Sequence, residues 1–536
     1  MQIANTASWK QRSVGRCAVP SAVTRHAVFA FCILHFACVG CAKAPPATPA
    51  PASLPAAAPL LDPLQQLRHD IDLLVDRSGH QYGTWGIVVQ SLAKDDRLYE
   101  RNPRTLLVPA STMKLVPLAA AAEAVGWDYR FRTQLLATGP IERGALRGDL
   151  VVVGSGDPSV LGRPDPGVTP GWVDALRRRG VTRVEGGIIG DDDDVEEPRP
   201  GLSWSWEDMG FGYGAMPGAL NLRENVTTLI VSPGNAVGLP TILEVDPAPP
   251  GAPVVNSTTT SPPGTPPGVW PELGPGDPGL TVRGSIPAGS AAIRLRTAVG
   301  NPTLWFARSV RTDLLAAGID VAGPAVDVDD VAVKPDRTAA TLIHIHESPP
   351  LSQIAGPLLK ESINLYAEAA LWLATGREGA RTTGAALDAL RAGLESWGVP
   401  KDGIQIVDGS GLSRRDLVAA DTLVAILRRF HDPRGTSPWM QAFPIAGRDG
   451  SLEHRLKGTP AEANAVAKTG SMSSIRSLAG YVKTADGEPL AFAILANNFE
   501  GPGAGVTATI DAIVARLAAF RRALSGGTSV RRDYHP

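Results

Sequence analysis

The chain has 536 residues, which is too many for one simple hydrophobic core and suggests two to four domains. Its 51 lysines and arginines nearly balance 53 aspartates and glutamates, so the formal net charge of −2 argues against a nucleic-acid partner. All four cysteines lie at the N-terminal end, between Cys17 and Cys41, which excludes a disulfide framework and a thiolate metal site in the rest of the chain.

The N-terminal 41 residues have the pattern of an export signal. A basic region precedes the apolar run 27–39, which is too short for an ordinary membrane span. The run ends in Cys38-Val-Gly-Cys41, close to the processing box of bacterial lipoproteins, although Cys38 stands where leucine is usual. We therefore predict a signal peptide over residues 1–41, a lipid on Cys41 and action outside the cytoplasm. Cleavage at another position and a retained N-terminal anchor are the alternatives.

Residues 42–63 form a segment rich in proline and alanine, for which we predict an extended, disordered tether. The first folded unit is expected to begin at residue 64 with a helix over 67–75. A strand pair is predicted at 85–89 and 96–100. Between these strands, Ser91-Leu-Ala-Lys94 is interpreted as a hairpin turn on the surface, because two aspartates follow it.

Ser111 and Lys114 are the most informative pair of residues, because a spacing of three places them on one face of a helix. Ser111 opens the apolar segment 113–123, and alone it would be a helix N-cap. A lysine inside an apolar helix needs a further reason. Held away from water, it can lose its charge and take the proton of the serine. We therefore predict Ser111 as a nucleophile and Lys114 as its base.

The middle of the chain is predicted to alternate between strands and helices. Residues 150–154 and 184–190 are expected to be buried strands, with an amphipathic helix over 171–179 between them. The acidic run 191–194 is interpreted as a solvated turn, with a cation site as the alternative. Residues 245–278 are so rich in Pro, Gly, Ser and Thr that we predict a long loop.

Helices dominate the last third of the chain. They are predicted over 305–317, 352–375, 384–397, 421–430 and 506–522, with a strand hairpin at 478–483 and 490–497. His344 and His346 alternate in a strand before Glu347, and an exposed strand face is preferred to a metal site there. Residues 526–536 are expected to be disordered.

Two later segments fit the chemistry of Ser111 and Lys114. They are Ser362-Ile-Asn364 and Lys468-Thr-Gly470. Alone, the first would be an ordinary helix–loop junction and the second a common turn. In this order with S-x-x-K, however, they make the serine–lysine pattern of penicillin-recognising enzymes.

Further motifs extend this pattern along the chain. They are Pro109-Ala-Ser-Thr-Met-Lys-Leu115, Gly154-Ser-Gly-Asp-Pro158, Ser348-Pro-Pro-Leu351, Glu361-Ser-Ile-Asn-Leu-Tyr-Ala-Glu368, Asp408-Gly-Ser-Gly-Leu-Ser413, Ala446-Gly-Arg-Asp-Gly-Ser-Leu452, Lys468-Thr-Gly-Ser471 and Gly480-Tyr-Val482. With them, residues 64–519 resemble the low-molecular-mass class C penicillin-binding proteins, the D-alanyl-D-alanine carboxypeptidases/endopeptidases of the DacB (PBP4) type in peptidase family S13. Ile363, where the family usually has a polar residue, and Ser471, where threonine is common, depart from the family pattern.

The resemblance implies an α+β fold. Residues 64–135 and 340–525 would form a discontinuous transpeptidase/β-lactamase-like catalytic domain, in which an antiparallel sheet packs with helices. Residues 136–339 would form two inserted, mostly β domains. Ser111 would lie at a helix N-terminus, where the helix dipole favours an oxyanion.

The resemblance also implies a role for each site residue in hydrolysing peptidoglycan stem peptides. Ser111 would attack the carbonyl between two D-alanines, with Lys114 as its base, and β-lactams would acylate the same serine. Ser362 would relay the proton, and Asn364 would hold Lys114 and the substrate amide. Lys468 would attract the terminal carboxylate and lower the pKa of Lys114 by repulsion. Thr469 and Ser471 would bind that carboxylate, and Gly470 would let the backbone approach the substrate.

The backbone N–H groups of Ser111 and Ser471 would form the oxyanion hole. The loop 408–413 is expected to shape the site, and no cofactor or metal is expected. A β-lactamase or esterase is one alternative function, although no extra base for the deacylating water can be assigned. A catalytically idle cell-wall-binding scaffold is another, and the intact motifs argue against it.

Overall fold

The computed structural model describes residues 61–80, 82–162, 168–196, 200–248, 253–274 and 279–522, which belong to one compact unit, Leu61–Pro536. The predicted signal peptide with Cys41, nearly all of the tether and the tail 526–536 lie outside the described residues. Among the helices of the described part, none is long and apolar enough to cross a membrane.

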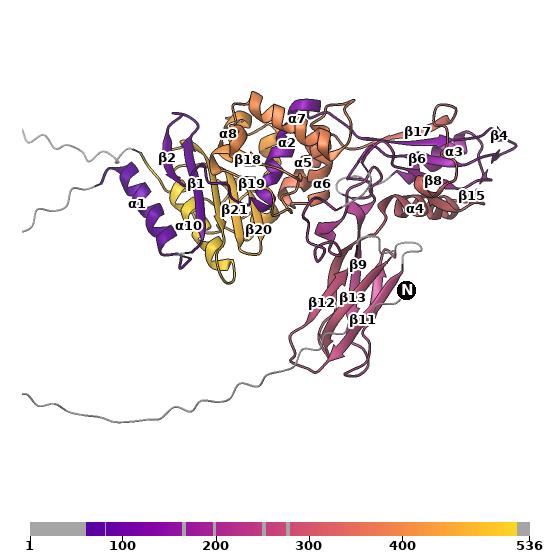
Figure 1. Cartoon of the computed structure of the whole chain (residues 1–536), viewed down its shortest axis with the longest axis horizontal. Helices are drawn as coiled ribbons and strands as arrows, with labels where there is room; N and C mark the ends of the chain where they lie inside the picture. Colours follow the sequence, from indigo (N-terminus) through magenta and orange to yellow (C-terminus); the bar gives the residue numbers. More distant parts are fainter. Residues whose placement is uncertain are drawn as a thin grey trace, which may run out of the picture. The chain divides into compact units, whose positions relative to one another are not determined.

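A five-stranded antiparallel sheet joins the two ends of the described chain (Figure 1). Its order is β2 (Arg97–Arg101), β1 (Thr84–Ser91), β22 (Pro489–Asn497), β21 (Ile475–Lys483) and β20 (Val466–Met472). The predicted N-terminal strand pair and C-terminal hairpin are both confirmed. Ser91 accepts a hydrogen bond from the backbone N–H of Lys94 at 3.0 Å, so the predicted turn is also confirmed, although the Ser91 side chain is buried.

The central strand β22 is apolar along its whole length because both of its faces are covered. Its side chains alternate between two hydrophobic clusters. Ala491, Ala493 and Leu495 enter the cluster formed with α2 (Leu115–Val125), α6 (Asn364–Leu373) and α8 (Ala420–Phe430). Leu490, Phe492, Ile494 and Ala496 enter the cluster formed with α1 (Pro63–Asp76) and α10 (Ala504–Ala518). The sheet is therefore packed between two layers of helices.

The prediction of one continuous helix over 352–375 is wrong, because the structure has two helices there, α5 (Leu351–Lys360) and α6. Ser362 has a φ of 61°, in the left-handed region, where a right-handed helix cannot continue. The break therefore places Ser362 just before α6 and Asn364 at its first residue.

A second five-stranded sheet, which includes parallel pairs, is formed by strands that follow α2 and precede α5 in the chain. Its order is β16 (Ala325–Asp327), β8 (Ile188–Asp191), β6 (Leu150–Val153), β3 (Arg132–Ala137) and β17 (Thr341–Glu347). The helices α3 (Thr169–Arg178) and α4 (Pro302–Ala316) supply its core with Trp172 and Phe306. The strand predicted over 184–190 is two separate strands, β7 (Arg183–Val184) and β8, because Gly186 and Gly187 turn the chain between them.

The long loop predicted over 245–278 is wrong. This region contributes strands to two three-stranded sheets, β10 (Ile242–Asp246) with β9 (Val226–Ser232) and β14 (Ile293–Ala298), and β11 (Val254–Ser261) with β13 (Leu280–Pro287) and β12 (Gly268–Glu272). In β11, Thr258 and Thr260 are buried between exposed neighbours. The β-branched residues therefore outweigh the turn-forming composition on which the prediction relied.

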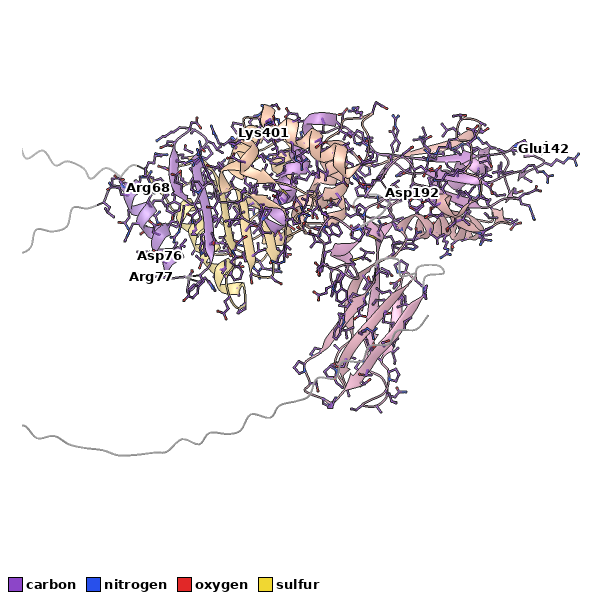
Figure 2. The ribbon with its side chains drawn as sticks, in the orientation of Figure 1. Arg68, Asp76, Arg77, Glu142, Asp192 and Lys401 are labelled. Atoms are coloured by element: carbon purple, nitrogen blue, oxygen red, sulfur yellow. The ribbon has the colours of Figure 1, made fainter. Side chains whose placement is uncertain are left out.

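The acidic run 191–194 is not simply a solvated turn. Asp191 and Asp192, the latter labelled in Figure 2, are both buried. Asp191 pairs with Arg337, and Asp192 accepts a hydrogen bond from Thr303. Within the described ranges, no group of three or more potential ligands could hold a metal ion. Partners that are distant in the sequence therefore explain why these carboxylates are buried.

The remaining elements are short strands and peripheral helices. They are β4 (Ile141–Glu142), β5 (Ala145–Leu146), β15 (Asp320–Val321), β18 (Ile404–Gln405), β19 (Leu417–Val418), α7 (Thr383–Ser396) and α9 (Pro438–Gln441).

Candidate active site

Ser111 lies in a tight turn that leads into α2. Residues Ala110–Lys114 form a 3₁₀ helix, in which side chains three apart eclipse, so Ser111 and Lys114 are brought together. Ala110 has a φ of 48°, an uncommon conformation for a residue with a side chain. The carbonyl of Pro109 accepts hydrogen bonds from Thr112 Oγ1 at 2.8 Å and from Ser477 Oγ at 2.6 Å. These buried hydroxyls fix the turn.

Asn497, at the end of β22, holds the segment before this turn. Its side-chain oxygen accepts the N–H of Val108 at 2.8 Å, and its amide nitrogen donates to the Val108 carbonyl at 3.0 Å. The side chain is 3% exposed. The sequence analysis missed this clamp, because a single asparagine after an apolar strand does not indicate which backbone it binds.

Lys114 is fully buried, and its amino group contacts three oxygen acceptors. Nζ lies 2.8 Å from Ser111 Oγ, 2.6 Å from Asn364 Oδ1 and 2.8 Å from the Ser410 carbonyl. Burial lowers the pKa of Lys114 to about 7, although the nearby carboxyls of Asp408, Glu368 and Asp416 act in the opposite direction. A group poised near neutral pH is suited to accept and return a proton.

Asn364 and Ser362 reach the site from the break between α5 and α6. The amide nitrogen of Asn364 donates to the Tyr213 carbonyl at 2.7 Å, which turns its oxygen toward Lys114. Ser362 Oγ accepts a hydrogen bond from Lys468 Nζ at 2.8 Å. The structure therefore brings the first two sequence motifs together through Lys114 and joins the second to the third through Lys468.

Lys468 is also fully buried, on strand β20. Nζ donates to Ser362 Oγ and, at 2.8 Å, to the Thr469 carbonyl. Burial and the charge of Lys114 lower the pKa of Lys468 well below its usual value. At Lys114, by contrast, burial is the cause of the shift. Repulsion between two ammonium groups is mutual, so the expectation that Lys468 lowers the pKa of Lys114 stays a prediction.

The remaining residues of the third motif continue along β20. Thr469 Oγ1 donates to Ser451 Oγ at 2.8 Å, and the Ser471 side chain is exposed. A Cβ added at Gly470 would lie 2.1 Å from Ser477 Oγ and 2.6 Å from the Pro109 carbonyl oxygen. Gly470 was expected to let the backbone approach the substrate. Its packing gives a second reason for glycine at this position, because only a glycine lets β20 lie against the turn that carries Ser111.

β20 is the edge strand of its sheet, with β21 on one side. Apart from the single bridge between Ile445 and Val466, no strand of the described part pairs with its other side. The free N–H and C=O groups of such an edge can bind an extended peptide as an additional strand.

A buried lysine on a serine hydroxyl, a Ser-x-Asn break and a Lys-Thr-Gly edge strand together are typical of penicillin-recognising serine peptidases. The comparisons with known proteins agree. The chain belongs to the D-Ala-D-Ala carboxypeptidase 3 (S13) family, whose model matches residues 67–520, and it is a serine-type peptidase.

Individual relatives support this assignment. The chain is 34% identical over 475 residues to a D-alanyl-D-alanine carboxypeptidase of an Actinomadura species, with 85% of each chain covered. It is 26% identical to the D-alanyl-D-alanine carboxypeptidase DacB of Haemophilus influenzae, covering 77% of this chain and 85% of the relative. The crystal structure of penicillin binding protein 4 (dacB) from Haemophilus influenzae shares the fold, with a TM-score of 0.74, 24% identity and coverage of 84% and 99%.

We predict that Gly470→Ala slows penicillin acylation at least about tenfold, because the added methyl group must push β20 away from the Ser111 turn. The measurement is the rate of labelling by a fluorescent penicillin, alongside the midpoint of unfolding. Gly393→Ala in α7 is the matched control, since its Cβ meets no atom within 4 Å. A folded Gly470→Ala protein that acylates at the wild-type rate would contradict this account of the close packing.

Proposed function

We propose that the protein hydrolyses the bond between the terminal D-alanines of peptidoglycan stem peptides, as a carboxypeptidase, an endopeptidase or both, through an acyl-enzyme on Ser111. The observation that carries the proposal is the fully buried amine of Lys114, 2.8 Å from Ser111 Oγ. Membership of the S13 family supports the choice of substrate.

The three contacts of Lys114 suggest how it acts as a base. A neutral amine has two N–H donors and one lone pair. Asn364 Oδ1 and the Ser410 carbonyl can only accept, so they take the two N–H groups. The lone pair is then left for the hydroxyl of Ser111, the third contact. Asn364 and Ser410 thus orient the base as well as hold it.

Acylation follows from this arrangement. Lys114 takes the proton of Ser111 as Oγ attacks the peptide carbonyl, and the resulting oxyanion is bound by the N–H groups of Ser111 and Ser471. The C–N bond then breaks, and the departing amine receives a proton by way of Ser362, whose hydroxyl contacts Lys468 Nζ. Water attacks the ester, with Lys114 again as base, and frees the serine.

The terminal carboxylate of the substrate is assigned to Lys468, Thr469 and Ser471, which provide a cation and two hydroxyls along the edge strand β20. In the free protein, burial and Lys114 disfavour the charge of Lys468. A bound carboxylate would favour that charge again. Substrate binding and protonation of Lys468 are therefore linked.

We also propose the domain limits and location that follow from the sequence. The sequence limits are residues 64–135 and 340–525 for the catalytic domain and 136–339 for the inserted domains. Because β3 (Arg132–Ala137) and β17 (Thr341–Glu347) belong to the second five-stranded sheet, we place the boundaries before β3 and after β17. The signal peptide 1–41 directs the protein out of the cytoplasm, and a lipid on Cys41, followed by the tether 42–63, attaches it to a membrane.

β-Lactams are its covalent inhibitors. Among its relatives, the Haemophilus influenzae protein has been crystallised with a β-lactam.

We predict that a labelled penicillin modifies Ser111 and that Ser111→Ala abolishes the labelling. Ser91→Ala is the matched control, because Ser91 belongs to the other S-x-x-K segment, where its hydroxyl accepts the N–H of Lys94 in a turn. Mass spectrometry of the digested protein identifies the site, and a labelled Ser111→Ala protein would refute the assignment. Slow release of the label indicates a carboxypeptidase, fast turnover a β-lactamase, and no labelling of the wild type an idle scaffold.

We predict that the acylation rate rises with pH until Lys114 loses its proton near its pKa of about 7 and then levels off, since only the neutral amine is a base. Lys114→Arg should lose at least about a hundredfold in rate, because arginine keeps its proton. Stopped-flow measurement of the acylation rate between pH 5 and 9 gives both the pH profile of the wild type and the rate of Lys114→Arg. Near-normal rates for Lys114→Arg would mean that charge alone matters at this position.

We predict that a peptide ending in D-Ala-D-Ala is cleaved about tenfold to a hundredfold faster than its C-terminal amide, the range expected for one charge-assisted hydrogen bond. Lys468→Ala should reduce this preference, because the buried cation is removed. The measurement is kcat/KM for both peptides on both proteins. Equal rates on the wild type would favour a general esterase.

A further inference from the structure

Glu368 is a buried carboxyl close to the proposed base that the mechanism above does not use. It follows Asn364 by one turn of α6, so both side chains lie on the same helix face. It is 7% exposed, and an acidic side chain this deep in a helix needs partners. Its partners include two backbone N–H groups, Ser410 at 2.9 Å from Oε1 and Gly409 at 2.9 Å from Oε2, and the Ser410 side chain.

The loop that Glu368 binds is the loop that contacts Lys114. Ser410 donates its N–H to Glu368, and its carbonyl accepts from Lys114 Nζ. Gly409 and Gly411 pack the loop tightly, because a Cβ on Gly409 would lie 2.5 Å from the Ala367 carbonyl oxygen and one on Gly411 2.0 Å from that of Ala110. Two residues of α6 therefore act on Lys114. Asn364 contacts it directly, and Glu368 acts through Ser410.

Three buried carboxyls and one amine surround the ammonium group of Lys114. Glu368 comes from α6, Asp408 and Asp416 come from the segment between β18 and β19, and Lys468 comes from β20. Asp408 is held by the N–H groups of Gly411 and Ser413 and by the indole N–H of Trp204. Burial and Asp408 raise the pKa of Asp416 to about 10 and that of Glu368 to about 8.

We propose that Glu368 is a positioning residue for the base: through its bonds to the Gly409 and Ser410 N–H groups it aims the Ser410 carbonyl at Lys114. The inference rests on the proposed function, in which Lys114 must be neutral to accept the proton of Ser111. Because the pKa of Glu368 is raised to about 8, its carboxyl is mostly protonated where Lys114 titrates, so the role is one of geometry and not of charge.

Glu368→Gln and Glu368→Asp test this positioning role. Glutamine keeps the shape, but its NH₂ group faces one of the two N–H donors. We expect the plateau of the acylation rate to fall roughly tenfold, the effect of one lost hydrogen bond, and the half-rise to stay at the wild-type pH. Aspartate is shorter and cannot reach both N–H groups, so it should also lower the plateau and keep the half-rise.

The experiment measures the rate of penicillin acylation of Ser111 from pH 5 to 9 in wild type and both variants. Glu123→Gln is the control, because it makes the same substitution on α2, where Glu123 pairs with Arg429 near the surface. A folded Glu368→Gln protein with a wild-type plateau would overturn the inference. If that variant does not fold, a Glu368→Asp protein with a wild-type plateau would overturn it as well. No labelling of wild-type Ser111 would instead refute the proposed function, so the two failures can be told apart.

Discussion

The structure of the site depends on one constraint, the complete burial of the Lys114 amine among oxygen acceptors. An ammonium ion is costly to remove from water, whereas a neutral amine is not, so burial converts an ordinary cation into a base. The acceptors come from three distant segments: the Ser111 turn, the start of α6 and the loop at Ser410. Each segment must be placed to within a few tenths of an ångström for the amine to be both held and directed. The helices on both faces of the sheet support this placement.

Local strain accompanies this precision. Ala110 and Ser362 both have positive φ although neither is glycine, and each immediately precedes or belongs to a catalytic motif. Such conformations cost about 1–3 kcal/mol each and persist only where the surroundings impose them. The conformation of Ala110 is imposed by the hydrogen bonds of Asn497 to Val108 and by the hydroxyls that donate to the Pro109 carbonyl. The conformation of Ser362 is imposed by the hydrogen bond from Lys468 and by the start of α6.

Local patterns of spacing and alternation were sufficient to predict two strand pairs of the catalytic sheet and to select the three motifs. The strand β20 was not predicted from alternation, and the sheet as a whole was implied by the family resemblance. Ser111–Lys114 is a helical spacing, and β21–β22 is a hairpin of apolar strands. Composition misled the prediction for 245–278, where threonine and valine build strands between prolines. The loop 408–413 was expected to shape the site, but the contacts made by Asn497, Ser410 and Glu368 were not predicted, because each involves a backbone group that only the folded chain brings near. Asp191 and Asp192 were misjudged for the same reason, since Arg337 and Thr303 are remote in sequence.

The Asn497 clamp has a consequence for when activity can arise. Val108 and Asn497 are 389 residues apart, and the strand that ends at Asn497 lies in the middle of the sheet that supports the nucleophile turn. Contacts this distant in the chain form slowly, since a long loop must close before they contribute. A nascent chain that already contains Ser111 and Lys114 thus lacks the strand that places them, and its serine is inert. Because β22 is the last strand of this sheet to be synthesised, we expect Ser111 to become reactive only after Asn497 has been added to the chain.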